Sequence, residues 1–209
     1  CGVTYEASQL VVTCGAKESL ALAMAALADP GDEILLTKPA WLSYAPMAAG
    51  FGIQVREVPT DAEHHFRLTA EALDAAIGER TRAVVINSPN NPTGGVDPRA
   101  EFEALAEVVK ARDIQIISDE IYWPFVFDGK HVSPASLPGM AEHTVVVNGL
   151  SKSHAMTGWR VGFVAAPPPV AAAIASLKSH MSSNISTPAQ HAALGALACG
   201  DGHTNTMRE

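Results

Sequence analysis

The sequence is poor in cysteine and has no long apolar run. Its three cysteines, Cys1, Cys14 and Cys199, are odd in number and widely spaced, and no CxxC pair occurs. A disulfide framework or a zinc site is therefore not expected, and a reducing compartment such as the cytoplasm is favoured. No apolar run reaches the roughly 18 residues that a membrane span needs, so we expect no contact with a membrane.

Basic residues are also few. Lysine and arginine number 14 against 22 acidic residues, which gives a net charge of −8. This balance argues against a nucleic-acid partner, which usually requires a basic face. It does not exclude a small anionic ligand, because a helix terminus or a single arginine can bind one inside an acidic protein.

The composition is that of a soluble globular domain. Hydrophobic residues make up 47% of the 209 residues and charged residues 17%, which suits one large domain with a real core. The start lacks the basic segment and apolar core of a signal peptide. Both ends resemble the middle of a longer chain, as the ends of a fragment would.

Short apolar runs alternate with longer helical stretches. The runs that predict strands are Leu10–Thr13, Glu33–Thr37, Ile53–Val58, Ala83–Asn87, Ile114–Ser118, Thr144–Asn148 and Val161–Ala166. Several are apolar at every position, which is typical of strands buried on both faces of a parallel sheet, although periodicity alone leaves a buried helix open.

Helices are predicted at Lys17–Ala28, Trp41–Ala49, Thr69–Ile77, Asp97–Ala111, Pro168–His180 and Pro188–Cys199. Thr69 is expected to cap its helix, and Asp97 is expected as N-cap with Pro98 at the first helical position. The alternation predicts an α/β fold with three layers, in which helices cover both faces of a mostly parallel sheet of about seven strands.

Ligands of such sheets bind outside the carboxyl ends of the strands, so the loops that follow the apolar runs are informative. In VTCGAKESL, residues 12–20, a tight Gly15–Ala16 turn leads from a strand into a helix, whose free N–H groups and dipole would attract a phosphate. In NSPNNPTGG, residues 87–95, Asn91 could donate a hydrogen bond to a ligand oxygen. Ordinary turn chemistry is the alternative for both loops.

Two further loops carry charged residues. In SDEIYWPF, residues 118–125, Asp119 ends a buried strand, where an acid is costly unless paired. It could hold a ring nitrogen protonated, and a helix cap or an exposed acid is the alternative. In VNGLSKSHAMTGWRVGF, residues 147–163, Lys152 follows a strand and could form a Schiff base, although a solvated lysine is more common. Arg160 follows it by eight residues.

Together the four loops resemble those of the fold-type I aminotransferases of the aspartate aminotransferase family (class I/II), which use pyridoxal 5′-phosphate (PLP). GAK, NNPTG, DEIY and SK with Arg160 occur in the family's order and at its spacings, over nearly the whole chain. One motif alone would be weak, but a chance match of all four in order is very improbable. The resemblance implies that residues 1–209 form the PLP-binding large domain.

The resemblance also implies residue roles. Lys152 would form the Schiff base with PLP, Asp119 would pair with the pyridine nitrogen, and Tyr122 would bind the phenolic oxygen together with Asn91. Trp41 and Ile121 would lie against the two ring faces. The residues implied to hold the phosphate are Gly15, Ala16, Lys17, Ser151 and Arg160. No metal is expected, because His64, His65 and His154 fit a solvated loop and a helix start.

The resemblance has two departures. Gly149 stands where some family members have a phosphate-binding serine. The N-terminal segment, with a tyrosine that reaches the partner subunit's phosphate, and the small C-terminal domain, with an arginine for the substrate carboxylate, are not found in the sequence. For the full-length protein, the resemblance implies a homodimer acting on an amino acid and a 2-oxo acid.

Three alternatives compete with a transaminase. A lyase or synthase of the same fold, such as a C–S lyase or an aminocyclopropane-carboxylate synthase, would share the lysine, aspartate and tyrosine. A PLP-sensing domain of a transcriptional regulator is supported by fold-level analogy alone. A doubly wound nucleotide-binding domain has little support, because the sequence contains neither GxGxxG nor GxxxxGK[ST].

Overall fold

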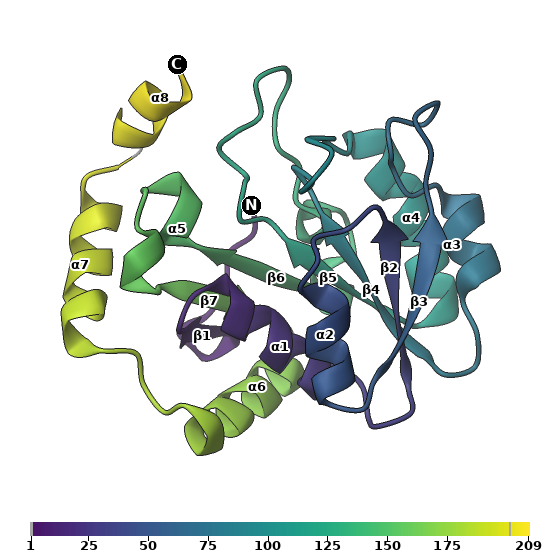
Figure 1. Ribbon diagram of the computed structural model, residues 1–209, viewed down its shortest axis with the longest axis horizontal. Coiled ribbons are helices and arrows are strands. Elements are labelled where there is room, and N and C mark those ends of the chain that lie inside the picture. Colours follow the sequence, from purple (N-terminus) through teal and green to yellow (C-terminus); the bar gives the residue numbers. More distant parts are fainter. Residues whose placement is uncertain (1, 201) are drawn as a thin grey trace.

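The computed structural model describes residues 2–200 and 202–209. A single seven-stranded sheet has the order β1-β7-β6-β5-β4-β2-β3 (Figure 1). The strands are β1 (Leu10–Thr13), β2 (Glu33–Lys38), β3 (Gln54–Pro59), β4 (Thr81–Asn87), β5 (Gln115–Asp119), β6 (Thr144–Gly149) and β7 (Gly162–Ala165). Strand β7 is antiparallel to both of its neighbours, β1 and β6, and all other pairs of neighbouring strands are parallel, so the predicted, mostly parallel sheet is confirmed.

The seven predicted strands are all present, with bounds within two residues of those expected. The central strands β4, β5 and β6 are buried along almost their whole length, whereas the edge strand β3 is mostly exposed. This difference explains why runs that are apolar at every position identified the central strands, since both of their faces are covered.

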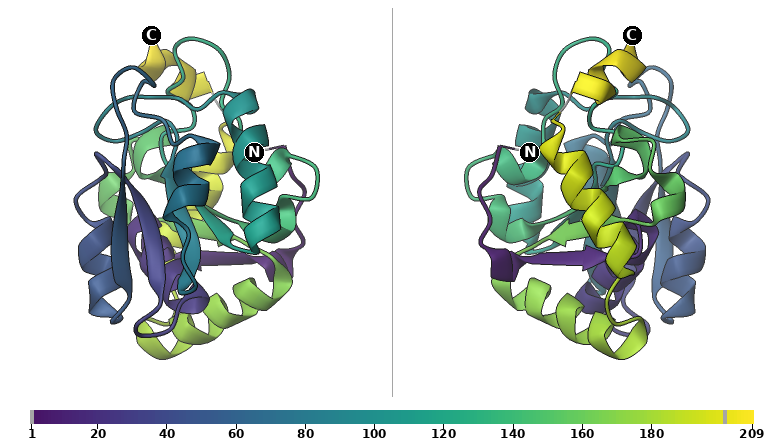
Figure 2. Two further views of the ribbon diagram at one scale, coloured as in Figure 1. Left: turned by 90° about the vertical axis from the view of Figure 1, so that its right-hand side faces the viewer. Right: turned by 90° about the vertical axis from the view of Figure 1, so that its left-hand side faces the viewer.

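Helices cover both faces of the sheet. One layer contains α1 (Ala16–Leu27), α2 (Tyr44–Gly50) and α6 (Pro168–Met181), and the other contains α3 (Ala70–Ala76) and α4 (Arg99–Arg112). The short α5 (Leu150–Ser153) follows β6, and α7 (Thr187–Ala198) and α8 (Gly202–Arg208) run along one side of the molecule to its C-terminus (Figure 2). Short 3₁₀ turns are η1 (Ala7–Gln9), η2 (Pro134–Ser136), η3 (Ala141–His143) and η4 (Thr157–Trp159).

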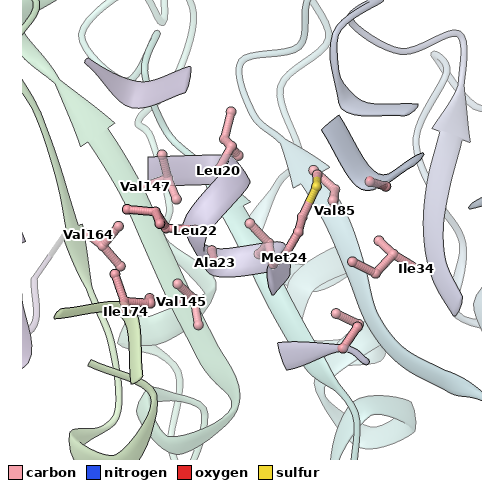
Figure 3. Packing of buried hydrophobic residues seen from close by; sticks show 14 of the residues in the cluster. Leu20, Leu22, Ala23, Met24, Ile34, Val85, Val145, Val147, Val164 and Ile174 are labelled. Atoms are coloured by element: carbon pink, nitrogen blue, oxygen red, sulfur yellow. The ribbon is translucent and has the colours of Figure 1, made fainter. Parts of the chain in front are cut away.

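The main core lies between α1 and the sheet. Leu22 of α1 packs in one cluster with Val145, Val164 and Ile174, so that α6, α1 and the strands share buried surface (Figure 3). Each such fully buried side chain contributes about 2 kcal/mol through removal of apolar surface from water. This packing fixes the N-terminus of α1 above the carboxyl ends of the central strands.

Three local predictions had different outcomes. Thr69 caps α3, because its Oγ1 accepts a hydrogen bond of 3.2 Å from the Ala72 amide. Asp97 does not cap α4, so that prediction was wrong: Pro98 is the N-cap, and Asp97 is buried against Ser88, whose Oγ accepts from the Asp97 amide at 2.9 Å. Trp41 lies before α2 and outside it.

Two of the cysteines are free and exposed, namely Cys14 and Cys199. Cys1 lies outside the described residues. Within the described part of the chain, no helix is both long enough and apolar enough to cross a membrane.

Candidate active site

A cleft of about 440 Å³ lies at the carboxyl ends of β4, β5 and β6, next to the start of α1. Its lining includes every predicted site residue except Gly15. Gly15 is the N-cap of α1 and directly precedes Ala16, which does line the cleft. The predicted residues in the lining are Ala16, Lys17, Trp41, Asn91, Asp119, Ile121, Tyr122, Ser151, Lys152 and Arg160. Leu20, Tyr44, Asn87 and Thr157 also line it and were not predicted.

At one end of the cleft, the turn before α1 meets Arg160. Gly15 has a φ of 79°, and a Cβ there would collide with the Arg160 guanidinium. Arg160 donates hydrogen bonds to the carbonyls of Thr157 at 3.1 Å and Cys14 at 3.4 Å. A Cβ at Gly162 would overlap the Ala16 amide, so only glycines allow this close approach of the turn, the guanidinium and β7. First-turn amides, a helix dipole and a guanidinium form a donor set that suits a phosphate.

Deeper in the cleft, Asp119 is 3% exposed. Its Oδ2 accepts a hydrogen bond of 2.7 Å from the Tyr44 hydroxyl, and its Oδ1 accepts one of 3.2 Å from the Ile121 amide. Burial raises the pKa of Asp119 to about 6, the two hydrogen bonds act against this rise, and the charge of Glu120 adds to it. Among residues 2–200 and 202–209, no lysine or arginine pairs with it. A protonated pyridine nitrogen would supply the missing cation.

Lys152, in α5, faces the same cleft. Its Nζ lies 5.8 Å from the centroid of the Tyr122 ring, and no carboxylate within the described residues forms an ion pair with it. Burial and the Asp119 charge raise the pKa of Tyr122, while a side-chain hydrogen bond with Asn91 lowers it. Asn91 in turn donates from its backbone to Asn87 Oδ1 at 2.7 Å. The amine, the phenol and the amide thus converge on one space.

Tyr44 and Asn87 are residues that sequence reasoning missed. The Tyr44 ring meets Trp41 edge to face, with centroids 5.3 Å apart and an interplanar angle of 84°. Asn87 Nδ2 donates to the Asp119 carbonyl at 2.9 Å and so joins the ends of β4 and β5. Tyr44 lies three residues after Trp41 and Asn87 lies four residues before Asn91, so each is close in sequence to a predicted site residue.

Steric crowding explains why position 149 is a glycine. A Cβ at Gly149 would lie 2.7 Å from the Val161 carbonyl oxygen and 3.0 Å from Gly162 Cα. A serine there would need a shift of the backbone. Ser151 stays beside the cleft, and its carbonyl accepts a hydrogen bond of 2.9 Å from Thr157 Oγ1.

Two of the three histidines considered as metal ligands have other side-chain partners. His64 Nδ1 lies 2.9 Å from Asp61 Oδ1, and His154 Nδ1 lies 2.8 Å from Ser153 Oγ. Of the residues that the structure describes, no group of three or more His, Cys, Asp or Glu side chains could hold a metal ion.

Comparison with known proteins gives the family. The model of the family "Aminotransferase class I and II" matches residues 2–209. The arginine–pyruvate transaminase of Pseudomonas aeruginosa is 45% identical over 208 residues, which are 100% of this chain and 53% of that protein. The probable aspartate/prephenate aminotransferase of Aquifex aeolicus is 48% identical over 197 residues, covering 93% of this chain and 50% of that protein.

Solved structures agree with these relatives. The aspartate aminotransferase from Rhizobium meliloti superposes with a TM-score of 0.95 at 38% identity, over 99% of this chain and 52% of that chain. The chain spans about half the length of the curated relatives it matches. It has the PLP-dependent transferase fold and belongs to the class I and II aminotransferases, a family of PLP-dependent enzymes.

Proposed function

We propose that the protein is a transaminase that moves an amino group between an amino acid and a 2-oxo acid, with PLP held in the cleft between Lys152 and Asp119. One observation carries this proposal: the same cleft is lined by a lysine and by a buried carboxylate, and among residues 2–200 and 202–209 the lysine has no carboxylate partner and the carboxylate no cationic partner. The start of α1 and Arg160 close that cleft with phosphate-binding groups. The relatives named above are transaminases, which does not favour a lyase of the same fold or a regulator.

The residues present suit PLP part by part. Asp119 would hold the pyridine nitrogen protonated, and Tyr122 and Asn91 would bind the phenolic oxygen. Trp41 and Ile121 would cover the ring faces. The phosphate would be held by Gly15, Ala16, Lys17, Ser151 and Arg160. When bound, the cofactor supplies an electron sink that stabilises negative charge at the substrate α-carbon.

Lys152 would have two roles. Its amine first holds the cofactor and, once displaced by the substrate amine, acts as general base and acid at Nζ. Nζ would take the α-proton of the amino acid and deliver a proton to the cofactor carbon on the other side of the amino nitrogen, and water would then release the 2-oxo acid, so that the amino group would stay with the cofactor. The buried Tyr44 hydroxyl keeps Asp119 oriented during this transfer.

The test is an absorbance spectrum of the protein mixed with PLP, with Lys152→Ala alongside. We expect the wild type to show the band of a PLP–lysine Schiff base, and borohydride to fix the cofactor on the peptide that contains Lys152. The variant should lose the band and transfer amino groups at least about 10³-fold more slowly. Exposed Lys130 offers a matched control, Lys130→Ala, which should behave as wild type. Full amino transfer by Lys152→Ala would refute the mechanism.

The wider setting is part of the same proposal. Residues 1–209 would form the PLP-binding large domain of a cytoplasmic homodimer. The free, exposed Cys14 and Cys199 support a reducing compartment. The exposed apolar side chains of α7, Leu194 at 65% and Leu197 at 60%, support a face that is covered in the assembly. Light scattering of the purified protein would test the dimer.

A further inference from the structure

Lys178 is a buried lysine outside the cleft. It lies in the last turn of α6 and is 6% exposed. Its Nζ donates to Ser182 Oγ at 3.1 Å and to the Ser183 carbonyl, and lies 3.4 Å from Glu18 Oε2. A buried ammonium is costly unless it is paired and hydrogen-bonded, so this arrangement calls for a reason.

Its partner, Glu18, belongs to the first turn of α1. The Glu18 carboxylate also accepts hydrogen bonds from the Ser182 hydroxyl and from the Cys14 amide. Burial raises the pKa of Glu18, but these hydrogen bonds and the charge of Lys178 outweigh it, and the net pKa is below the ordinary value. Glu18 is therefore an anion at neutral pH, held between the end of α6 and the start of α1.

The hydrogen bond to Cys14 places Glu18 behind the phosphate-binding turn. The Cys14 amide donates to Glu18, and the carbonyl of Cys14 accepts from Arg160 Nη2 at 3.4 Å. Gly15, the N-cap of α1, follows directly. Glu18 thus holds Cys14 by its amide, while Arg160 contacts the carbonyl of Cys14.

This arrangement creates an electrostatic conflict. An acidic residue in the first helical turn is favourable by itself, because it faces the positive end of the helix dipole. The same turn is proposed to receive the phosphate of PLP, and two anions at one helix start repel each other. Lys178 supplies a positive charge next to the Glu18 carboxylate. Lys17, on the same turn as Glu18, extends toward the Trp41 ring, with its Nζ 5.0 Å from the ring centroid.

We propose that Lys178 and Glu18 are positioning residues for the cofactor phosphate: Glu18 holds the Cys14–Gly15 turn against Arg160, and Lys178 neutralises Glu18 so that the phosphate is not repelled. Neither residue lines the cleft, so both act through the turn. The inference rests on the proposed function, because the phosphate concerned is that of PLP.

Binding of PLP and of pyridoxal, which lacks the phosphate, separates this role from a general structural one. In Lys178→Met the carboxylate stays without its counter-charge. We expect PLP to bind about 10-fold to 100-fold more weakly and pyridoxal to bind unchanged. In the double variant Glu18→Gln/Lys178→Met the glutamine can still accept from Cys14, and most of the PLP affinity should return. Both equilibria can be followed by absorbance, with circular dichroism as a check of folding.

Lys110 provides a matched control. It forms a pair with Glu107 at 2.6 Å on the surface of α4, far from α1 in the fold, so Lys110→Met should bind PLP as wild type does. If Lys178→Met fails to fold, Lys178→Arg and the double variant carry the same test, with near wild-type PLP affinity expected for both. PLP affinity equal to wild type in Lys178→Met, or equal losses for PLP and pyridoxal, would overturn the inference alone. A wild-type protein that binds neither compound would overturn the proposed function itself.

Discussion

Asp119 and Glu120 are consecutive acids at the end of β5, and both are buried, at 3% and 1% exposure. Glu120 is satisfied within the protein: Ser118 Oγ donates to it at 3.0 Å, Ser133 Oγ at 2.5 Å, and His131 Nε2 lies 3.0 Å away. Within the part of the chain that the structure describes, Asp119 accepts hydrogen bonds from the Tyr44 hydroxyl and the Ile121 amide alone.

The difference separates a structural acid from a functional one. A buried carboxylate is tolerated when hydrogen bonds and a positive or polarisable partner compensate it, as around Glu120. Around Asp119 this compensation is incomplete, and the pKa of its carboxyl is correspondingly raised to about 6, mainly by burial. A buried carboxylate that lacks full compensation and lines a cleft is a candidate for binding a positively charged ligand group.

Of the changes at these two acids, Asp119→Asn is expected to have the largest effect. The amide keeps the shape of the carboxyl but cannot hold a pyridine nitrogen protonated, so the ring loses its capacity as an electron sink. We expect amino transfer to fall about 10³-fold, equivalent to about 4 kcal/mol of transition-state stabilisation, with the fold intact. Steady-state kinetics would measure the loss, with circular dichroism as the check of folding. A variant within threefold of wild type would contradict the role of Asp119.

Glu120→Ala should reduce the stability of the protein and leave the activity of the folded protein unchanged. The change leaves Ser118, Ser133 and His131 without their acceptor in a buried site. We expect the free energy of unfolding to fall by about 3 kcal/mol, because unsatisfied buried donors are costly. Where the protein is still folded, the Schiff-base spectrum and the rate per folded molecule should be retained. Urea denaturation would give the first quantity, and loss of activity without loss of stability would contradict the division between the two acids.

The sequence allows one of these acids to be recognised and leaves the other obscure. The position of Asp119 at the end of a buried strand makes it a candidate for holding a ring nitrogen protonated, and the resemblance of DEIY to a family motif implies the pyridine nitrogen as its partner. Two of the three partners of Glu120, His131 and Ser133, lie 11 and 13 residues further on, in a loop without the periodicity from which contacts can be inferred. Tyr44 lies in the segment Trp41–Ala49 that is predicted to form a helix, and no pattern in this segment shows that its hydroxyl reaches a carboxylate 75 residues away.

The fold was predictable for a related reason. Strands buried on both faces are apolar along their length, and this pattern is local, so the bounds of β5 and β6 came out almost correct. The hydrogen-bond partner of a side chain, by contrast, depends on residues that are distant in the sequence. Asp97 looked like a helix cap, but it packs with Ser88 in the loop after β4, and the helix therefore begins at Arg99.

The smallest expected effect is a pH dependence of stability in the cofactor-free protein. The folded-state pKa of Asp119, about 6, lies above the ordinary value of 3.8, because burial favours the neutral acid. Its contribution to stability is therefore fully present below pH 4 and is lost as the pH rises through 6. Between pH 4 and pH 7 the wild type should lose roughly 2 to 3 kcal/mol relative to Asp119→Asn. Urea denaturation of both proteins across this range would measure the difference.

Addition of PLP sharpens this measurement. A protonated ring nitrogen beside Asp119 favours the carboxylate, so the cofactor should reduce the loss in the wild type above pH 6 by more than it does in Asp119→Asn. The Glu120→Ala variant still contains Asp119 and should show the wild-type dependence on a lower baseline. Parallel stability curves for wild type and Asp119→Asn would mean that the Tyr44 and Ile121 hydrogen bonds already compensate Asp119.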